Sequence, residues 1–375
     1  LVVRAVRGGS VCVDLAALQQ QIRAEELPWP AAQEWTAAVS ASVLAGDPPV
    51  LHVENGLVYL DRYWIEECRV ARDVLALAAG RRSDPTPDVA RLFPDSYAEQ
   101  RAAAEVALSR ALTVLTGGPG TGKTTTVVRL LALLQSHARA QHGRPLRVAL
   151  AAPTGKAAAR LGESIASAIA SLPEALRADI PAQAATLHKL LQVRPGGGMA
   201  APVPALALDL VVVDEASMID LEMMARLLRA VPLHASVILL GDKDQLASVE
   251  AGAVMGQLCH GAQAGRYSAA TVAWLAEVAG VDLGPWQGDG GVLAQQTVML
   301  RHSRRFAGDS PIGQWARAVN AGEGVTVRQL WQQAPVAGRS SANWRTMARD
   351  NPRSSTPAKP TPAQASKTSA KRSAS

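Results

Sequence analysis

A glycine-rich loop that contains a lysine and three threonines is the clearest chemical signal in the sequence. The stretch GGPGTGKTT begins at residue 117, with the spacing of a phosphate-binding P-loop between an apolar run and an amphipathic run. Backbone N–H groups of such a loop converge on phosphate, the lysine reaches the β- and γ-phosphates, and the hydroxyl ligates Mg²⁺. The residues expected to hold the nucleoside triphosphate, with Lys123 also catalytic and Thr124 on the metal, are Gly117, Gly118, Pro119, Gly120, Thr121, Gly122, Lys123, Thr124 and Thr125.

A pair of carboxylates ends a second apolar run, LDLVVVDEAS, at residues 208–217. Because parallel strands all end at one edge of a sheet, Asp214 and Glu215 are expected beside the P-loop. Asp214 would hold Mg²⁺, and Glu215 would orient or deprotonate the attacking water. The alternative is that the two carboxylates only cap the helix that follows.

A third run, SVILLGDKDQ, delivers Gln245 to the same edge. A glutamine at this place can sense the γ-phosphate or the attacking water. Gly241, Asp242 and Asp244 are also typical turn residues, and a turn is compatible with a sensor.

The elements that must position these residues alternate between short β-rich runs and helical runs from about residue 96. This alternation predicts an α/β fold, a parallel sheet flanked by helices, that carries the P-loop. We expect this ATPase lobe over residues 96–296, with a small insertion near 193–205. Residues 297–335 would begin a second, incomplete lobe, and the Ser/Pro/Ala/Lys-rich residues 336–375 would form a disordered basic tail.

Residues 1–95 predict a small, mainly helical domain that docks on a partner. The runs LAALQQQI and WIEECRVARDVLAL have helical spacing, and PPVLHVENGLVYLDRYW reads as a hairpin that turns at ENG. The polar, proline-containing stretch RRSDPTPD would link this domain to the lobe.

Charge and cysteine content bear on nucleic-acid binding and on the redox state of the compartment. The chain has a net charge of +6, but residues 336–375 hold eight Lys and Arg and one Asp, so the remainder is close to neutral. The basic balance therefore says little about a groove on the folded body. Cys12, Cys68 and Cys259 are too few and too far apart for a disulfide framework or a zinc site, which indicates a reducing compartment. The sequence begins at Leu1, so we expect residues to be missing upstream.

Further motifs, in order, resemble those of superfamily 1 DNA helicases. They are GLVYLDRYW, GGPGTGKTTTV, APTGKAAARL, TLHKLL, VVVDEASMID, GDKDQLASVEAG and LRHSRRF followed by SPIGQWARAVNAG. Within that superfamily the set is most similar to the RecD-type alpha subunits of exodeoxyribonuclease V, the RecBCD helicase–nuclease. The resemblance covers most of residues 1–325. The resemblance implies a RecA-like P-loop NTPase fold for the lobe. Gln100, placed before the P-loop, together with GDKDQL argues against another ATPase class, such as an AAA-type loader.

The resemblance implies roles for further residues. Gln100 would recognise adenine, and Arg305, with Arg304 as the alternative, would be the arginine finger. Two motifs would contact the DNA strand. In the alternative, the threonine of each motif only caps a helix, and the other residues of the motif are ordinary surface residues. Their candidate residues are Pro153, Thr154, Lys156, Thr186 and His188. No aromatic residue lies between Tyr97 and Tyr267, so a strand held by the lobe would be held through its phosphates.

By this resemblance the protein would be an ATP- and Mg²⁺-dependent 5′→3′ DNA helicase subunit. It would act with RecB- and RecC-like subunits on double-strand ends in recombinational repair, in the bacterial cytoplasm. Nothing in the chain resembles a nuclease metal site, so a partner would supply exonuclease activity.

The family pattern stops after AVNAGEGV, before the second motor lobe, and truncation or a frameshift is the simplest account. Because arginine fingers contribute ~10³-fold or more at related sites, we expect this chain to bind Mg·ATP, hydrolyse it slowly and not unwind DNA alone. The alternative function is an ATP-binding assembly module without unwinding activity.

Overall fold

The computed structural model describes residues 1–21, 29–80, 89–193, 203–243, 245, 251–304, 314, 318–319 and 322–333. The chain divides into two compact units, Leu1–Ser310 and Pro311–Ser375. In the second unit the described residues include helix α13, Gly324–Gln333. The expected linker at 81–88, the basic tail at 336–375 and most of the expected insertion lie outside the described residues.

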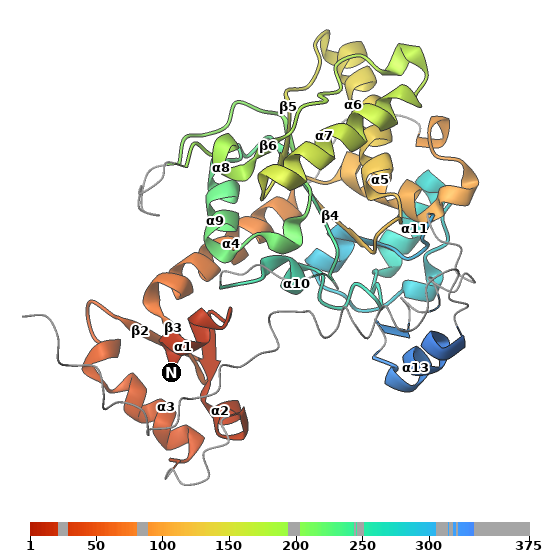
Figure 1. Cartoon of the computed structure of the whole chain (residues 1–375). Coiled ribbons are helices and arrows are strands. Elements are labelled where there is room, and N and C mark those ends of the chain that lie inside the picture. Colours follow the sequence, from red (N-terminus) through yellow and green to blue (C-terminus); the bar gives the residue numbers. More distant parts are fainter. Residues whose placement is uncertain are drawn as a thin grey trace, which may run out of the picture. The chain divides into compact units, whose positions relative to one another are not determined.

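A six-stranded parallel sheet is the centre of the first unit (Figure 1), in the order β6-β5-β7-β8-β4-β9. Its strands are β4 (Leu112–Gly117), β5 (Val148–Ala152), β6 (Ala185–Thr186), β7 (Leu210–Val213), β8 (Ser236–Gly241) and β9 (Thr297–Leu300). The apolar runs of the sequence become these strands because a parallel sheet covered on both faces buries almost every side chain. The predicted α/β fold is confirmed.

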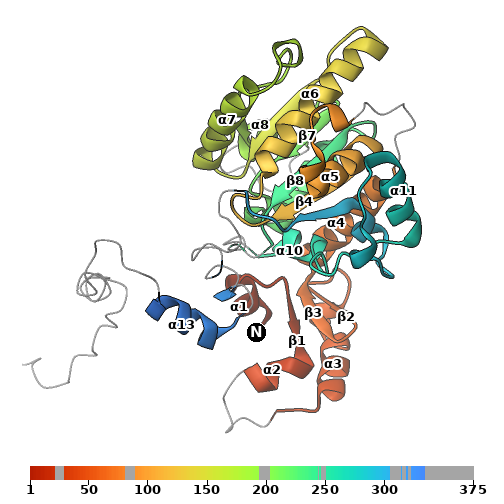
Figure 2. The same ribbon diagram turned by 90° about the vertical axis from the view of Figure 1, so that its right-hand side faces the viewer.

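Alternate side chains of each strand supply two separate cores. On β7, Val211 and Val213 belong to one buried cluster, whereas Leu210 and Val212 belong to the other. The helices of one cluster are α5 (Ala98–Ser109), α6 (Lys123–His142), α7 (Gly155–Ala170) and α11 (Ala269–Ala279). The helices of the other are α4 (Asp61–Ala79), α8 (Leu187–Leu190), α9 (Leu221–Ala230) and α10 (Val254–Leu258). Figure 2 shows α6 and α7 side by side on their face of the sheet.

The strand β9 corrects the expected end of the lobe. Thr297–Leu300 pairs in parallel with β4, so this segment completes the first sheet and does not begin a second lobe at residue 297. Leu300 is fully buried against the same core as α5 and α6. The run QTVML is a strand in either arrangement, and only its long-range pairing decides to which sheet it belongs.

The N-terminal part contains a three-stranded antiparallel sheet in the order β1-β3-β2. The hairpin expected around ENG is present, as β2 (Leu51–Glu54) and β3 (Leu57–Leu60). A third strand, β1 (Cys12–Asp14), pairs with β3 and was not expected, because three residues are too few to show a period. The helices here are α1 (Val2–Arg7), α2 (Leu15–Gln21) and α3 (Ala32–Ser40).

Helix α4 joins the N-terminal sheet to the lobe that is built on the six-stranded sheet. Val70 and Val74 of α4 share a buried cluster with Met224 and Leu228 of α9. The side-chain amide of Gln296 also donates to the carbonyl of Ala78 near the end of α4, at 3.1 Å. A boundary at residue 95 therefore does not separate two cores.

Candidate nucleotide site

The P-loop lies between β4 and α6 at the carboxyl edge of the sheet. Gly122 begins α6 with φ +91°, a left-handed conformation that favours glycine. A Cβ at Gly117 would lie 2.7 Å from the Leu300 carbonyl oxygen and 2.9 Å from Thr121 Oγ1. The glycine lets β9 and the loop approach each other closely.

Lys123 folds over the loop that it follows. Its ammonium donates to the carbonyl oxygens of Gly117 and Gly118, the latter at 3.3 Å. Burial lowers the pKa of the Lys123 ammonium, while the negative charges of Asp242, Asp214 and Glu215 oppose that shift. The lysine thus stands where loop carbonyls and acidic side chains meet.

Two carboxylates follow β7, as the sequence predicts. The Asp214 carboxylate accepts a hydrogen bond from the Glu215 N–H at 2.9 Å, and Glu215 has φ +53°. A non-glycine residue in this conformation costs of order 1–3 kcal/mol and is often found at functional sites. Burial raises the pKa of both carboxyl groups, and for Glu215 the charge of Asp214 raises it further.

The capping alternative for this acidic pair is wrong. Helix α9 is capped by Asp220, whose carboxylate accepts from the Met223 N–H at 2.7 Å. Asp214 and Glu215 are left at the sheet edge, next to the P-loop.

Strand β8 lies between the strands of the P-loop and the acidic pair. Its end carries the buried Asp242, whose carbonyl accepts from the Gln245 N–H at 3.2 Å, so this segment turns. The Lys243 N–H donates to Thr116 Oγ1 of β4 at 3.2 Å, which ties the turn to the P-loop strand. Gln245 is exposed.

One cleft of about 1280 Å³ brings most of the predicted residues together. Gly117, the last residue of β4, does not line the cleft, and neither do Gln100, Pro153, Thr186 and His188. Sequence reasoning missed Arg160, Ser164, Ser167 and Met218; the four-residue spacing from Lys156 is the signal that could have found Arg160 and Ser164. The predicted residues that line the cleft are Gly118 to Thr125, Thr154, Lys156, Asp214, Glu215, Gln245 and the alternative finger Arg304.

Gln100 supports the loop from behind. It is 2% exposed, and its amide nitrogen donates to the Thr121 carbonyl at 3.1 Å. Thr121 in turn donates from its hydroxyl to the Gly118 carbonyl at 2.9 Å. The expected contact of Gln100 with adenine stays a prediction.

Arg304 meets the P-loop from the segment after β9. Its N–H donates to the Gly120 carbonyl at 2.7 Å, and its guanidinium lies 3.7 Å from the Tyr97 ring centroid and donates to the Ser96 carbonyl. The expected arginine finger, Arg305, lies outside the described residues. Arg304, the alternative, has one guanidinium nitrogen engaged away from the loop.

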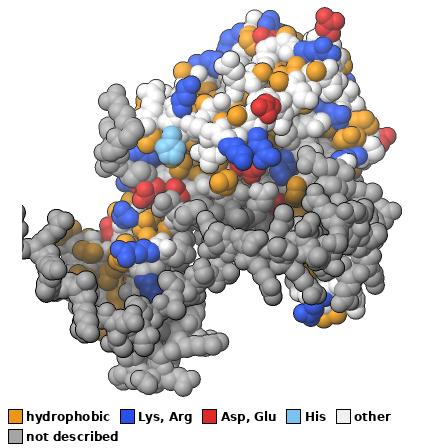
Figure 3. Space-filling model, in the orientation of Figure 1, with side chains coloured by type: hydrophobic (Ala, Val, Ile, Leu, Met, Phe, Trp, Pro, Cys, Tyr) orange, Lys and Arg blue, Asp and Glu red, His pale blue; other side chains and the backbone are white. Residues whose placement is uncertain are grey.

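The two motifs that we expect to contact the DNA strand lie at the starts of helices. Thr154 accepts from the Ala157 N–H at 3.2 Å and caps α7, and Thr186 accepts from the Lys189 N–H at 3.2 Å and caps α8. The capping alternative is therefore confirmed for both threonines, and their contact with a DNA strand stays a prediction. Pro153 is half-buried, and Lys156 and His188 are exposed. Lys and Arg side chains are spread over the face of the lobe that carries α7 and α8 (Figure 3).

The chain was compared with known proteins. A family model described as an AAA domain matches residues 100–251. The RecBCD enzyme subunit RecD of Mycolicibacterium smegmatis is 55% identical over 266 residues, which are 70% of this chain and 48% of that protein. The RecBCD enzyme subunit RecD of Mycobacterium tuberculosis strain H37Rv is 48% identical over 332 residues, 88% of this chain and 52% of that protein, so the chain is similar to RecD subunits over most of its length. It spans about half the length of each of these relatives.

Two further similarities involve helicases. An ATP-dependent RecD2 DNA helicase of Deinococcus radiodurans is 40% identical over 154 residues, 41% of this chain and 18% of that protein. The crystal structure of the Pif1 helicase from Candida albicans aligns with a TM-score of 0.35 and 18% identity. That alignment covers 62% of this chain and 46% of the other.

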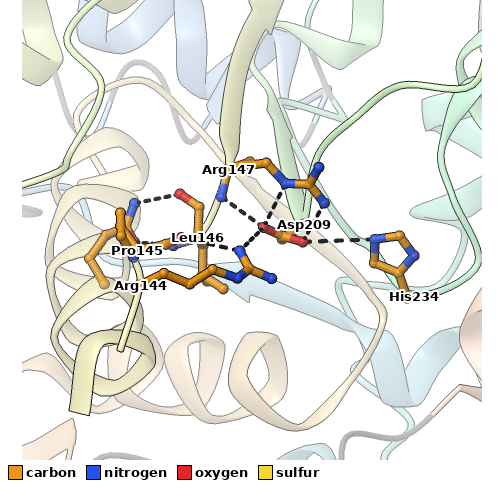
Figure 4. A network of polar contacts seen from close by, with 7 residues as sticks. Arg144, Pro145, Leu146, Arg147, Asp209 and His234 are labelled. Carbon is orange, nitrogen blue, oxygen red and sulfur yellow. Dashed lines mark hydrogen bonds and ion pairs between the residues drawn. The ribbon is translucent and has the colours of Figure 1, made fainter. Parts of the chain in front are cut away.

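A second charged cluster of this lobe lies at the opposite, amino edge of the sheet (Figure 4). The Asp209 carboxylate pairs with Arg147 at 3.0 Å and with Arg144 at 3.1 Å, and His234 lies 3.8 Å away. The Arg147 N–H also donates to Asp209 at 2.9 Å. These bonds join the segments that enter β5, β7 and β8, so the cluster serves the sheet and not the cleft.

The described residues lack both a metal-ligand cluster and a membrane-spanning helix. No group of three or more His, Cys, Asp or Glu side chains could hold a metal ion by itself. No helix in the described ranges is both long and apolar enough to cross a membrane.

Proposed function

We propose that this chain is the ATP-binding motor lobe of a DNA helicase subunit and hydrolyses Mg·ATP in a DNA-dependent way. One observation carries the proposal: Lys123, Glu215 and Gln245 line a single cleft, and the start of α7 forms another wall of it. The triphosphate and the DNA contact would thus share one cleft.

The donor set fits Mg²⁺. Thr124 and Asp214 supply a hydroxyl and a carboxylate at one cleft, and Mg²⁺ prefers oxygen ligands while keeping several waters and substrate phosphates. One Asp214 oxygen accepts the Glu215 N–H, which orients the carboxylate. The ion would neutralise charge on the phosphates.

The residues of the lobe would act as follows. Lys123 binds the β- and γ-phosphates, Glu215 takes the proton of the attacking water, and Gln245 senses the γ-phosphate. Arg305 would stabilise the transition state. The strand would lie along Pro153, Thr154 and Lys156, and at Thr186 and His188, held by its phosphates.

The similarity to RecD subunits supports the assembly. RecB- and RecC-like subunits would be the partners, double-strand ends the substrate, and 5′→3′ the polarity. An apolar patch on the N-terminal part is available for docking: Val43 is 93% exposed, Leu44 48% and Val50 54%, and the Val50 N–H bonds the Leu44 carbonyl at 2.8 Å. Exposed apolar patches often mark protein interfaces.

The test is ATP hydrolysis by the purified chain with and without single-stranded DNA, beside Lys123→Ala and the surface control Arg72→Gln. We expect slow turnover that DNA stimulates, and a loss of roughly 10²-fold or more in Lys123→Ala, comparable to removing one donor to developing charge. Arg72→Gln should match the parent. An ATP hydrolysis rate that changes neither with DNA nor in Lys123→Ala would contradict the proposal.

The assembly module is tested separately. If the chain binds ATP without turnover and co-purifies with RecB- and RecC-like subunits equally well as Lys123→Ala, the assembly function replaces the motor function. Unwinding by the chain alone would contradict the expectation that it cannot unwind by itself.

A further inference from the structure

The cleft holds a crowded set of acidic groups around Glu215. Asp214 directly follows β7, and Asp242 directly follows the neighbouring strand β8; the negative charges of both act on the Glu215 carboxylate. Two positive charges act on it as well, those of Lys123 and Arg160. Because the Lys123 ammonium is bonded to the carbonyls of Gly117 and Gly118, the other cation that faces Glu215 is Arg160.

Arg160 belongs to the wall of the cleft that is built by α7. One side of this helix is buried in the core through Ala158, Leu161 and Ile165. Lys156 and Arg160, one turn apart, are exposed and line the cleft. No hydrogen bond or ion pair engages the Arg160 guanidinium in the part of the chain that the structure describes.

We propose that Arg160 is a positioning residue for Glu215: from α7 it holds the Glu215 carboxylate across the cleft, and strand contact at the start of α7 sets how well it does so. The proposal rests on the proposed function. Thr154, Lys156 and Arg160 are parts of one rigid helix whose other side is packed on the sheet. A DNA phosphate that binds the first turn of α7 therefore also fixes the position of the next turn, which carries Arg160.

Arginine suits this role. Its guanidinium stays charged at any physiological pH and offers a planar set of donors that matches a carboxylate. In the reaction the water oxygen bonds to the γ-phosphorus, its proton passes to Glu215, and the bond from the γ-phosphorus to the ADP oxygen breaks. Arg160 exchanges no proton in this step; it fixes where the accepting carboxylate stands.

The first experiment separates positioning from nucleotide binding. Steady-state hydrolysis is measured with and without single-stranded DNA for the parent, Arg160→Gln, Arg160→Lys and the control Arg72→Gln. We expect kcat of Arg160→Gln to fall roughly tenfold, as for residues that orient a reacting group, with KM for ATP within about twofold. DNA stimulation should be lost, and Arg160→Lys should recover part of both. A raised KM with unchanged kcat would overturn the proposal, because Arg160 would then bind the nucleotide.

The second experiment works even if the chain does not turn over. Urea unfolding midpoints are compared for the parent, Arg160→Gln, Glu215→Gln and the double variant. We expect Arg160→Gln to shift the midpoint more in the parent than in the Glu215→Gln background. Equal shifts would overturn the proposal. If the midpoint shifts are unequal but the chain shows no DNA-stimulated turnover, the Arg160–Glu215 interaction is supported and the proposed function is contradicted.

Discussion

The side-chain amide of Gln100 donates a hydrogen bond to the carbonyl oxygen of Thr121, 3.1 Å away. Through this bond the start of α5 supports the P-loop from inside the lobe. The neighbouring Glu99 carboxylate accepts the N–H of Arg301 at 2.8 Å, so the same helix start also holds the segment after β9. Glu99 and Gln100, which are adjacent on α5, thus connect the P-loop to the segment that follows β9.

Replacing Gln100 by alanine is expected to weaken the binding of every nucleotide, because the buried amide supports the loop. We expect the Kd to rise for ATP and GTP by a similar factor, a few-fold, as for loss of one buried hydrogen bond. The measurement is competition of unlabelled nucleotides against a fluorescent ATP analogue. Gln257→Ala, an exposed site on α10, is the control. A selective loss of ATP over GTP would instead establish adenine recognition.

Replacing Gly117 by alanine is expected to destabilise the lobe, because the new Cβ would meet the Leu300 carbonyl at 2.7 Å. Overpacking of this kind costs about 1–3 kcal/mol in the free energy of unfolding. Gly118→Ala is the matched control, since a Cβ there meets nothing within 4 Å. Urea denaturation of the two variants gives the comparison. Equal stabilities would show that β9 and the loop are not in close contact.

Replacing Glu99 by alanine is expected to release the segment after β9. Its carboxylate accepts the N–H groups of Arg301 at 2.8 Å and His302 at 3.3 Å. Loss of these bonds in a buried place should cost about 1–3 kcal/mol in unfolding free energy. Hydrogen exchange of the amides at 301 and 302 should accelerate, and Glu99→Gln, which keeps one acceptor oxygen, should lie between. Unchanged exchange at these amides in Glu99→Ala would count against this anchor.

Replacing Asp209 by asparagine is expected to lower the unfolding temperature at pH 7 more than at acidic pH. The hydrogen-bonded Arg147 side chain holds the pKa of the Asp209 carboxyl well below its usual range. A group with a depressed folded-state pKa stabilises the fold above its unfolded pKa of about 4, and this stability is lost as the pH falls. The gap between parent and Asp209→Asn should therefore narrow from pH 5 downward.

The control for this pH series is Glu34→Gln, which removes an exposed carboxylate of α3. Its difference from the parent should stay small across the series. A gap for Asp209→Asn that is constant with pH would show that the ion pairs around Asp209 do not contribute to stability.

Much of the fold could be predicted because the signals are local. The run LTVLTG becomes β4 over Leu112–Gly117, and the P-loop pattern places a strand before Gly117 and a helix from Lys123. The strand β1 and the true end of the lobe could not be predicted. Cys12–Asp14 is too short for a periodic signal, and the run at 297–300 has the same sequence whichever sheet it joins.

The sequence by itself determined the chemistry of this protein: a P-loop lysine and threonine, a pair of carboxylates and a glutamine, each at the end of an apolar run. Such patterns are local, since the chain conformation that a P-loop needs depends on glycines within a few residues. Only the tertiary structure decided which of these groups share a cleft. It buried Gln100 behind the loop, set β8 between β4 and β7, and placed Arg160 and Glu215 on the same cleft. These relations depend on strand order and on which side of each helix the core buries, and both are settled by packing between segments far apart in the chain.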